Sequence, residues 1–188
     1  MTTQSIPSAR TPGQVTLRAL QRADAARIRR WMADLELIRF TVVVPGPEHG
    51  PLLPYSVAEA DQYVGTLVAD PTRRSFAIEL DGVHVGNVGL KEWRPGATVA
   101  ECFIEIGEAS ARGHGVGTLA MRRLLDIAFF ELGLSVVRLG VFAFNANAIA
   151  LYRRLGFVDE GRYGLHWADG GWHEINAMAL DRDRYPRA

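Results

Sequence analysis

The strongest constraint on the fold of this chain comes from the residues between Arg112 and Phe157. Three glycines at alternating positions precede a long amphipathic segment, a pattern typical of a tight turn that leads into a helix. A β-branched run at 136–142 follows, and then a second helical segment, 145–155, which Gly156 terminates. Helix, strand and helix in this order require a sheet on which the helices pack, so the segment predicts an α/β architecture.

Length and charge narrow the class of protein. The 188 residues, 48% of them hydrophobic, suffice for one domain with a substantial core. Lysine plus arginine and aspartate plus glutamate both number 21, so electrostatics give no reason to expect nucleic acid or an anionic membrane as partner. No apolar run approaches the roughly 20 residues of a membrane span, and the polar start lacks the core of a signal peptide. We therefore expect a flexible N-terminal tail, 1–14, and a single cytoplasmic domain, 15–188.

Cysteine and histidine, the usual ligands of zinc, are few and scattered in the sequence. Cys102 is the only cysteine, so neither an intramolecular disulfide nor a multi-cysteine metal site can form, and its apolar neighbours predict a buried side chain. The histidines have no metal-ligand spacing and are expected at the surface or in hydrogen bonds. The sequence therefore predicts no metal.

Hydrophobic patterning predicts the other elements. Strands are expected at 15–20, 75–80, 83–90, 98–106, 158–163 and 172–180, and helices at 23–34, 56–68 and 115–132. Asp81-Gly82 is a strong hairpin signal, and Ser56 with Glu59 forms a capping-box pattern. Four prolines make the segment 41–55 irregular, and loops of that length in compact domains are often lids or binding loops.

The glycine-rich turn has the properties of a phosphate-binding loop. The first N–H groups of a helix lack partners within it and carry a partial positive charge. Gly113, Gly115 and Gly117 allow the backbone to wrap an anion, and Arg112 or His114 could add charge. The spacing fits neither a P-loop nor a dinucleotide fingerprint. A glycine-rich connector that only turns a strand into a helix would explain the same glycines.

With the second helix included, the chain resembles the GNAT superfamily of acyltransferases, which use acetyl-CoA. Arg112, Gly115 and Gly117 fit the Gln/Arg-x-x-Gly-x-Gly/Ala phosphate motif of that family. The later family signature is matched by Asn145, Ala148, Leu151, Tyr152, Leu155, Gly156 and Phe157. The resemblance covers nearly the whole chain, and it is closest to the branch of ribosomal-protein N-terminal acetyltransferases and spermidine/diamine acetyltransferases.

The resemblance implies an α+β GNAT fold, in which helices cover both faces of a mixed, strongly twisted sheet whose central strands splay apart. It implies acetyl-CoA as co-substrate, no metal, and direct attack of an amine on the thioester. The pantetheine arm would lie in the splay, and a backbone N–H of the strand ending near 106–108 would polarise the thioester carbonyl. The implied contacts with acetyl-CoA come from Ile106, Gly107, Arg112, Gly113, His114, Gly115, Val116, Gly117, Thr118, Asn145 and Tyr152.

The same resemblance assigns the proton transfers. Tyr152 is the implied general acid for the departing thiolate, because a tyrosine with an ordinary pKa near ~10 keeps its proton at neutral pH. In several family members a glutamate on the strand after the long helix acts as the general base, and this chain has Gly140 at that position. Glu101 matches a glutamate frequent in the polyamine branch and is the first candidate for the base. Glu105, Glu92 and a chain of waters remain alternatives.

The expected function is acetyl transfer from acetyl-CoA to a primary amine of a small molecule or a protein N-terminus. Gly140 keeps open a non-catalytic protein that senses acyl-CoA or a metabolite, and a longer acyl group is a third possibility. The acceptor is expected under 41–55, near Trp93 and Trp167. That segment holds a single acidic residue, Glu48, which does not favour a highly charged polyamine over a neutral or peptide amine. The branch is also compatible with a homodimer.

Overall fold

A mixed sheet of seven strands organises the computed structural model, which describes residues 13–40, 56–167 and 170–186. The strand order within these ranges is β1-β2-β3-β4-β5-β7-β6. The strands are β1 (Val15–Ala19), β2 (Arg74–Leu80), β3 (Val83–Lys91), β4 (Val99–Ile106), β5 (Val136–Phe142), β6 (Val158–His166) and β7 (Trp172–Asp181). The helices of four or more residues are α1 (Ala25–Met32), α2 (Leu35–Ile38), α3 (Val57–Ala69), α4 (Val116–Asp126), the π-helical η4 (Ile127–Glu131) and α5 (Ala146–Arg154).

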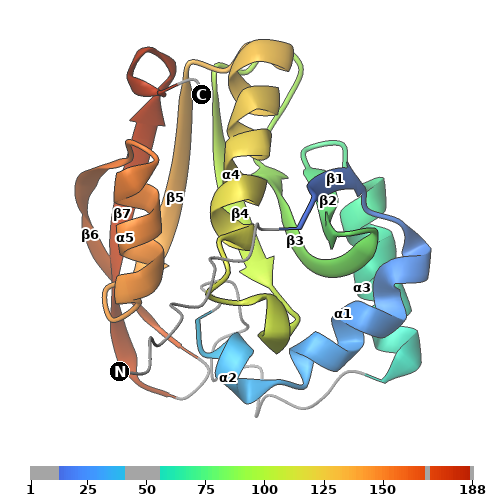
Figure 1. The fold of residues 1–188 in the computed structure, drawn as a ribbon. Helices are drawn as coiled ribbons and strands as arrows, with labels where there is room; N and C mark the ends of the chain where they lie inside the picture. Colours follow the sequence, from blue (N-terminus) through green and yellow to red (C-terminus); the bar gives the residue numbers. More distant parts are fainter. Residues whose placement is uncertain (1–12, 41–55, 168–169, 187–188) are drawn as a thin grey trace, which may run out of the picture.

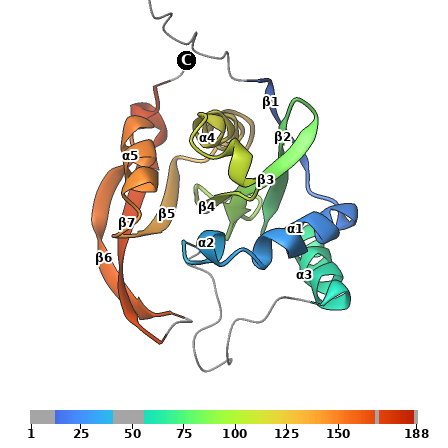
Figure 2. The same ribbon diagram turned by 60° about the horizontal axis from the view of Figure 1, so that its bottom comes forward.

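Helices cover both faces of the sheet, as Figures 1 and 2 show. The helices α4 and α5 lie on one face and enclose the larger hydrophobic core, to which Met121, Leu124 and Leu155 contribute fully buried side chains. On the other face, α1 and α3 form a smaller cluster around Trp31 and Val64. The layered arrangement of helices on both faces of a mixed sheet, expected from the sequence, is confirmed.

Local sequence signals produce the predicted turns and caps. Asp81 and Gly82 both have positive φ, 51° and 78°, as a two-residue hairpin between β2 and β3 requires. The hydroxyl of Ser56 accepts from the N–H of Glu59, whose carboxylate accepts from the N–H of Ser56. Gly156 follows α5 with φ 98°.

Two helices differ in detail from the prediction. The segment expected as one helix at 23–34 begins with a 3₁₀ turn, η1 (Arg22–Asp24), and its α-helical part, α1, ends at Met32; the short helix α2 that follows was not predicted. The helix expected at 115–132 continues beyond α4 as η4. The irregular segment expected at 41–55 and most of the tail 1–14 lie outside the described residues.

The two central strands β4 and β5 are parallel and separate after three pairs. Val99 pairs with Val136, and Glu101 with Arg138, where the pairing ends. Beyond that point β4 continues only with β3, and β5 only with β7. The sheet halves therefore diverge toward α2 (Figure 2), which is the splay expected from the sequence.

Candidate active site

The glycine turn joins β4 to α4 at the open end of the splay. Gly113 and Gly115 adopt left-handed backbone with φ 76° and 81°, and a Cβ at either would meet open space. Gly115 is the N-cap of α4 and has no side chain to satisfy the first N–H groups of the helix. The turn thus presents unpaired backbone donors at a positive helix end, which suits a phosphate.

Arg112 lies beside this turn, and its guanidinium is folded back onto the end of β4. It donates to the carbonyl oxygens of Ile106 and Gly107, both at 2.8 Å, and to the carboxylate of Asp34 at 3.0 Å. The Arg112 hydrogen bond lowers the pKa of Asp34. His114 is exposed, and its Nδ1 lies 2.7 Å from the carbonyl oxygen of Arg112. The side chain of Arg112 therefore ties β4 to the start of α2, while its positive charge remains near the turn.

Tyr152 projects from α5 into the larger core. It is 8% exposed, and its ring centre lies 5.7 Å from that of Phe157. Burial, reinforced by the nearby Cys102, raises the pKa of Tyr152 well above its ordinary value, so the phenol holds its proton at neutral pH. Asn145 begins the helix, and its side-chain oxygen accepts from the N–H of Ala148 at 3.2 Å. The cap explains why α5 starts there and how Tyr152 is oriented.

The opposite face of β4 carries the two candidate carboxylates. The side chains of Glu101 and Glu105 each contact a side chain of the neighbouring strand β3. Lys91 Nζ lies 2.7 Å from the Glu101 carboxylate, and the Asn87 amide donates to Glu105 at 2.7 Å. Burial raises the pKa of Glu105, although the Asn87 hydrogen bond and Arg112 oppose the shift. Glu101 is therefore held by a cation, whereas Glu105 is held by a neutral donor.

Glu92, the third candidate for the base, lies just beyond the end of β3. It is exposed and adopts a left-handed backbone with φ 59°. Trp93 beside it is buried, with the guanidinium of Arg74 4.2 Å above its ring. Neither residue lines the pocket described below.

Gly140 lies on β5, on the same side of the sheet as these carboxylates. A Cβ at Gly140 would lie 2.7 Å from the hydroxyl of Tyr163, which reaches from β6 across β7. Desolvation and, secondarily, Glu101 raise the pKa of Tyr163. The place of the absent glutamate is thus occupied by a phenol. Reading the sequence missed Tyr163, because no local pattern indicates which residue of β6 faces Gly140.

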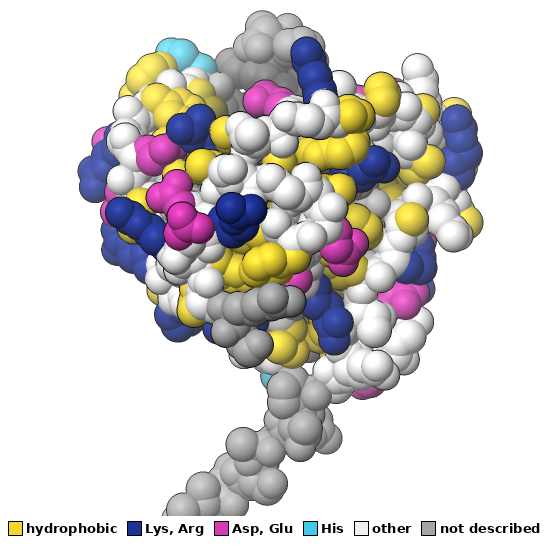
Figure 3. All heavy atoms as spheres, turned by 90° about the horizontal axis from the view of Figure 1, so that it is seen from above, with side chains coloured by type: hydrophobic (Ala, Val, Ile, Leu, Met, Phe, Trp, Pro, Cys, Tyr) yellow, Lys and Arg dark blue, Asp and Glu magenta, His cyan; other side chains and the backbone are white. Residues whose placement is uncertain are grey.

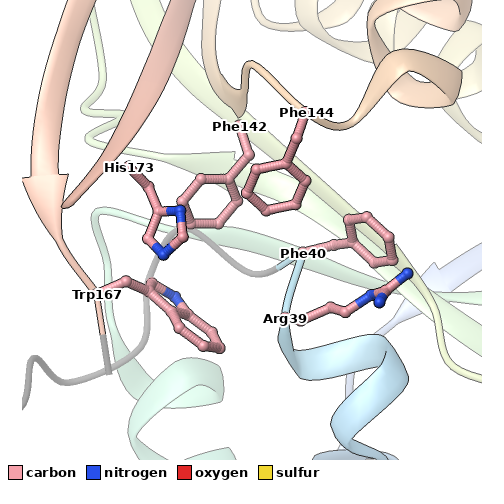
Figure 4. Close-up of a pocket in the computed structure, with 6 residues that line it drawn as sticks. All are labelled: Arg39, Phe40, Phe142, Phe144, Trp167 and His173. Atoms are coloured by element: carbon pink, nitrogen blue, oxygen red, sulfur yellow. The ribbon is translucent and has the colours of Figure 1, made fainter. Parts of the chain in front are cut away.

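An aromatic pocket of about 350 Å³ lies where β5 ends (Figure 4). Its lining residues are Arg39, Phe40, Phe142, Phe144, Trp167 and His173. Phe142 and Phe144 stack with ring centres 4.9 Å apart, and the guanidinium of Arg39 lies 4.7 Å from the Phe40 ring centre. Trp167, one of the two tryptophans expected near the acceptor, therefore lines a pocket. The remaining lining residues escaped prediction; the closely spaced Phe142 and Phe144 were the available signal.

Charge and metal-binding groups are dispersed over the described residues. Figure 3 shows basic and acidic side chains mixed on the face seen from above. Within the described ranges, no cluster of three His, Cys, Asp or Glu side chains is arranged to hold a metal ion. None of the helices in those ranges is both long and apolar enough to cross a membrane.

Comparison with known proteins identifies the family. Residues 14–158 match the acetyltransferase (GNAT) domain family. The spermidine N(1)-acetyltransferase of Escherichia coli K12 is 30% identical over 182 residues, which cover 96% of this chain and 91% of that protein. The Vibrio cholerae spermidine N-acetyltransferase in complex with CoA and spermine superposes with a TM-score of 0.78 at 27% identity, covering 92% of this chain and 98% of that one. A dodecameric structure of the V. cholerae enzyme gives a TM-score of 0.71 at 27% identity, covering 90% and 95% of the two chains. The chain therefore belongs to the GNAT family and is an acetyl-CoA-dependent N-acetyltransferase.

Proposed function

We propose that this enzyme acetylates a primary amine whose apolar or aromatic part occupies the pocket at the end of β5. The observation that carries the proposal is the position of that pocket, beside the open end of the splay and lined by aromatic side chains. In this arrangement the acetyl donor lies along the unpaired edge of β4, and the pocket holds the body of the acceptor.

The donor contacts follow the backbone of the site. The turn from Gly113 to Thr118 holds the diphosphate through N–H groups at the start of α4. The pantetheine arm pairs with the edge of β4 left open beyond Glu101 and reaches Ile106 and Gly107. Arg112 shapes this edge by binding the two carbonyl oxygens at its end. Asn145 orients α5, and with it Tyr152, toward the thioester.

The reaction requires one base and one acid. A carboxylate on the face of β4 opposite α4 and α5 takes a proton from the acceptor ammonium. The free amine then attacks the thioester carbonyl carbon. A backbone N–H at the open edge of β4 stabilises the resulting oxyanion. The C–S bond then breaks, and Tyr152 gives its proton to the thiolate. The amide nitrogen loses its second proton to solvent, from which the phenolate is reprotonated, so the products are amide, CoA thiol and one proton.

Charge in the pocket separates two acceptor classes. The relatives named above act on spermidine, which makes a polyamine the second candidate. The described lining residues carry no carboxylate, however, and their guanidinium, that of Arg39, lies 3.4 Å from the carboxylate of Glu36. Several ammonium groups would find no counter-charge among these lining residues, whereas a monoamine attached to a ring would stack on Phe142 or Trp167.

The test is thiol release from acetyl-CoA with a panel of amines. Arylalkylamines and peptides with an N-terminal aromatic residue should give at least about tenfold higher kcat/KM than spermidine, equivalent to about 1.4 kcal/mol of selectivity. Trp167→Ala should raise KM for the aromatic amines, while the exposed Trp172 offers a matched control substitution. Preference for spermidine would overturn the acceptor assignment. Calorimetric binding of acetyl-CoA without thiol release across the panel would favour the sensor.

Three further properties remain proposals for this chain. The dodecameric V. cholerae relative supports self-association, and the expected homodimer is the simplest form to test by light scattering. A cytoplasmic location is retained from the sequence. The division into a tail, 1–14, and one domain, 15–188, agrees with the start of the family match at residue 14 but needs limited proteolysis as a test.

A further inference from the structure

A continuous row of polar side chains runs from Arg18 of β1, through η1 and β3, to Glu105 of β4. The guanidinium of Arg18 binds both carboxylate oxygens of Asp24, at 2.7 and 2.8 Å. Asp24 Oδ1 lies 3.3 Å from Nδ1 of His84, and Nε2 of His84 lies 3.0 Å from the side-chain oxygen of Asn87. The amide nitrogen of Asn87 donates to Glu105. The row therefore joins a surface arginine to a carboxylate at the splay.

An irregularity in β3 brings these residues together. Side chains of a regular strand alternate between faces, so residues 84 and 87 would point to opposite sides. Here Ile78 pairs with Gly86 but Glu79 with His84, so β3 holds one extra residue at Val85. The bulge turns His84 to the face on which Asn87 and Glu105 are paired. Val85 instead joins the core under α4.

The row is almost completely enclosed. Asp24, His84 and Asn87 are 5–7% exposed, which is unusual for polar side chains and requires satisfied hydrogen bonds. The Trp31 ring covers His84, with centroids 4.9 Å apart and nearly perpendicular planes. Glu105 is partly buried, and it lies on the stretch of β4 beyond the last pair with β5.

Other charged groups surround the row without interrupting it. Glu79 binds Arg18, and Arg27 of α1 donates to the backbone carbonyl of His84. Glu108 pairs with Arg27 and accepts from the Trp31 indole. Arg112 acts on Glu105 at longer range. Burial lowers the pKa of His84 against the opposing effects of Asn87 and Asp24, and burial raises the pKa of Glu105 against those of Asn87 and Arg112.

Counting donors shows how many protons the row needs. With the amide of Asn87 oriented as in the structure, its oxygen needs a donor at His84 Nε2, while Asp24 favours a proton on Nδ1. This arrangement is satisfied by a His84 imidazolium beside an ionised Glu105. With the amide reversed, its nitrogen donates to a neutral His84, and its oxygen needs a protonated Glu105. Either state is fully bonded, and removing the shared proton leaves two lone pairs facing each other.

We propose that Asp24, His84, Asn87 and Glu105 form a one-proton chain, in which His84 or Glu105 holds a single mobile proton and Glu105 is the base of the reaction. The proposal rests on the acetyl transfer described above. Glu105 takes one proton from the acceptor ammonium and becomes a carboxylic acid. The amide of Asn87 reverses, and the Nε2 proton of His84 passes to solvent when the enclosed row opens transiently. One proton enters at Glu105 and one leaves at His84, so the total in the chain is unchanged.

The first test uses the free protein and needs no activity. Imidazole ¹⁵N signals of His84, followed by NMR from about pH 5 to about pH 9, should show protonation that depends on Glu105. In Glu105→Gln the negative partner is lost, and the pKa of His84 should fall by about one unit. The exposed Glu131→Gln is the matched control and should leave the His84 titration in place. A His84 titration that is identical in Glu105→Gln and in the control overturns the proposal.

The second test measures how kcat/KM depends on pH in two variants of His84. The readout is the acid limb, the low-pH range in which kcat/KM rises as the base loses its proton. In His84→Gln the new amide can donate to the Asn87 oxygen and should preserve an ionised Glu105. In His84→Phe the new side chain has no donor, so Glu105 should keep its proton to higher pH and the limb should move up by about one unit, a roughly tenfold loss of kcat/KM at pH values below the limb. Equal limbs in His84→Gln and His84→Phe overturn the proposal. If His84→Phe does not fold, Asn87→Leu, which cuts the same link, takes its place.

Glu101 provides the competing assignment. Glu105→Gln should abolish the acid limb and lower kcat/KM by roughly 10²-fold or more. Loss of the limb in Glu101→Gln, with the limb kept in Glu105→Gln, would overturn the role of Glu105. If no amine releases thiol but His84 and Glu105 titrate together by NMR, the proposed function fails while the proton chain stands. If thiol is released but the titrations are independent, only the chain fails.

Discussion

Packing between α1 and the end of β4 yields a prediction that the structure quantifies. A Cβ at Gly107 would lie 2.0, 2.3 and 2.4 Å from three atoms of the Trp31 indole, whereas ordinary contacts begin near 3.4 Å. Trp31 is 3% exposed, and its Nε1 donates to Glu108 at 3.2 Å. The ring would have to move by roughly 1 Å against a packed cluster.

Gly107→Ala should therefore lower the free energy of unfolding by about 2–4 kcal/mol. Overpacking of a core contributes about 1–3 kcal/mol, and weakening of the indole hydrogen bond to a carboxylate adds about 1 kcal/mol. Urea unfolding followed by circular dichroism measures the change. Gly117→Ala is the control, because its Cβ meets Leu151 at an ordinary 3.5 Å.

A double-mutant cycle isolates the clash itself. In the background of Trp31→Leu the indole is gone, so Gly107→Ala should cost less than about 0.5 kcal/mol and the coupling should exceed about 1.5 kcal/mol. An equal cost of Gly107→Ala in the presence of Trp31 and in the Trp31→Leu background would show that the cost does not arise from this contact and would refute the reasoning.

Three other changes test the site and its support. Tyr152→Phe should lower kcat by roughly 10²–10⁴-fold with unchanged affinity for acetyl-CoA, measured by thiol release and calorimetry; full turnover would remove Tyr152 as the acid. Gly115→Ala places a side chain at φ 81° and should cost roughly 1–2 kcal/mol of stability and weaken acetyl-CoA binding, both measurable on one sample. Burial opposes ionisation of Asp24, but hydrogen bonds from Arg18 and the Gln21 N–H lower its pKa below 3.8, so its ionised form stabilises the fold above about pH 4 and that contribution is lost as pH falls through the folded value. Asp24→Asn should thus be less stable at neutral pH, and its deficit should shrink in acid; a deficit independent of pH would contradict this sign.

The parts of the fold that could be predicted depend on neighbours in sequence. The hairpin at Asp81-Gly82 and the cap at Ser56 each combine residue types that only one backbone geometry satisfies. The splay and the cofactor followed from resemblance, and the fold and family were confirmed by comparison. The acid role of Tyr152 remains a proposal, and Glu101, the first candidate for the base from the sequence, remains the alternative to Glu105.

The parts that could not be predicted depend on contacts between distant strands. The contact between Tyr163 and Gly140 arises because β7 lies between β5 and β6, an order that no local pattern reveals. The burial of His84 depends on a bulge at Val85 in β3. The hydrophobic residues of this strand do not alternate regularly in the sequence, so one extra residue cannot be recognised there. Both features lie on the side of the sheet that carries Glu101 and Glu105, where the sequence was least informative.

The alternation of β4 has a consequence for the order of proton transfers. Cys102, near the phenol of Tyr152, and Ile104 pack into the core beneath α4 and α5, while Glu101 and Glu105 face the opposite side. In the proposed reaction the thioester lies at the edge of this strand, so the acid and the base approach it from opposite faces. The acceptor ammonium then meets a carboxylate before it can reach the buried phenol. Because burial keeps Tyr152 protonated and separate from the base, the enzyme can remove a proton from the amine and supply one to the thiolate at the same pH.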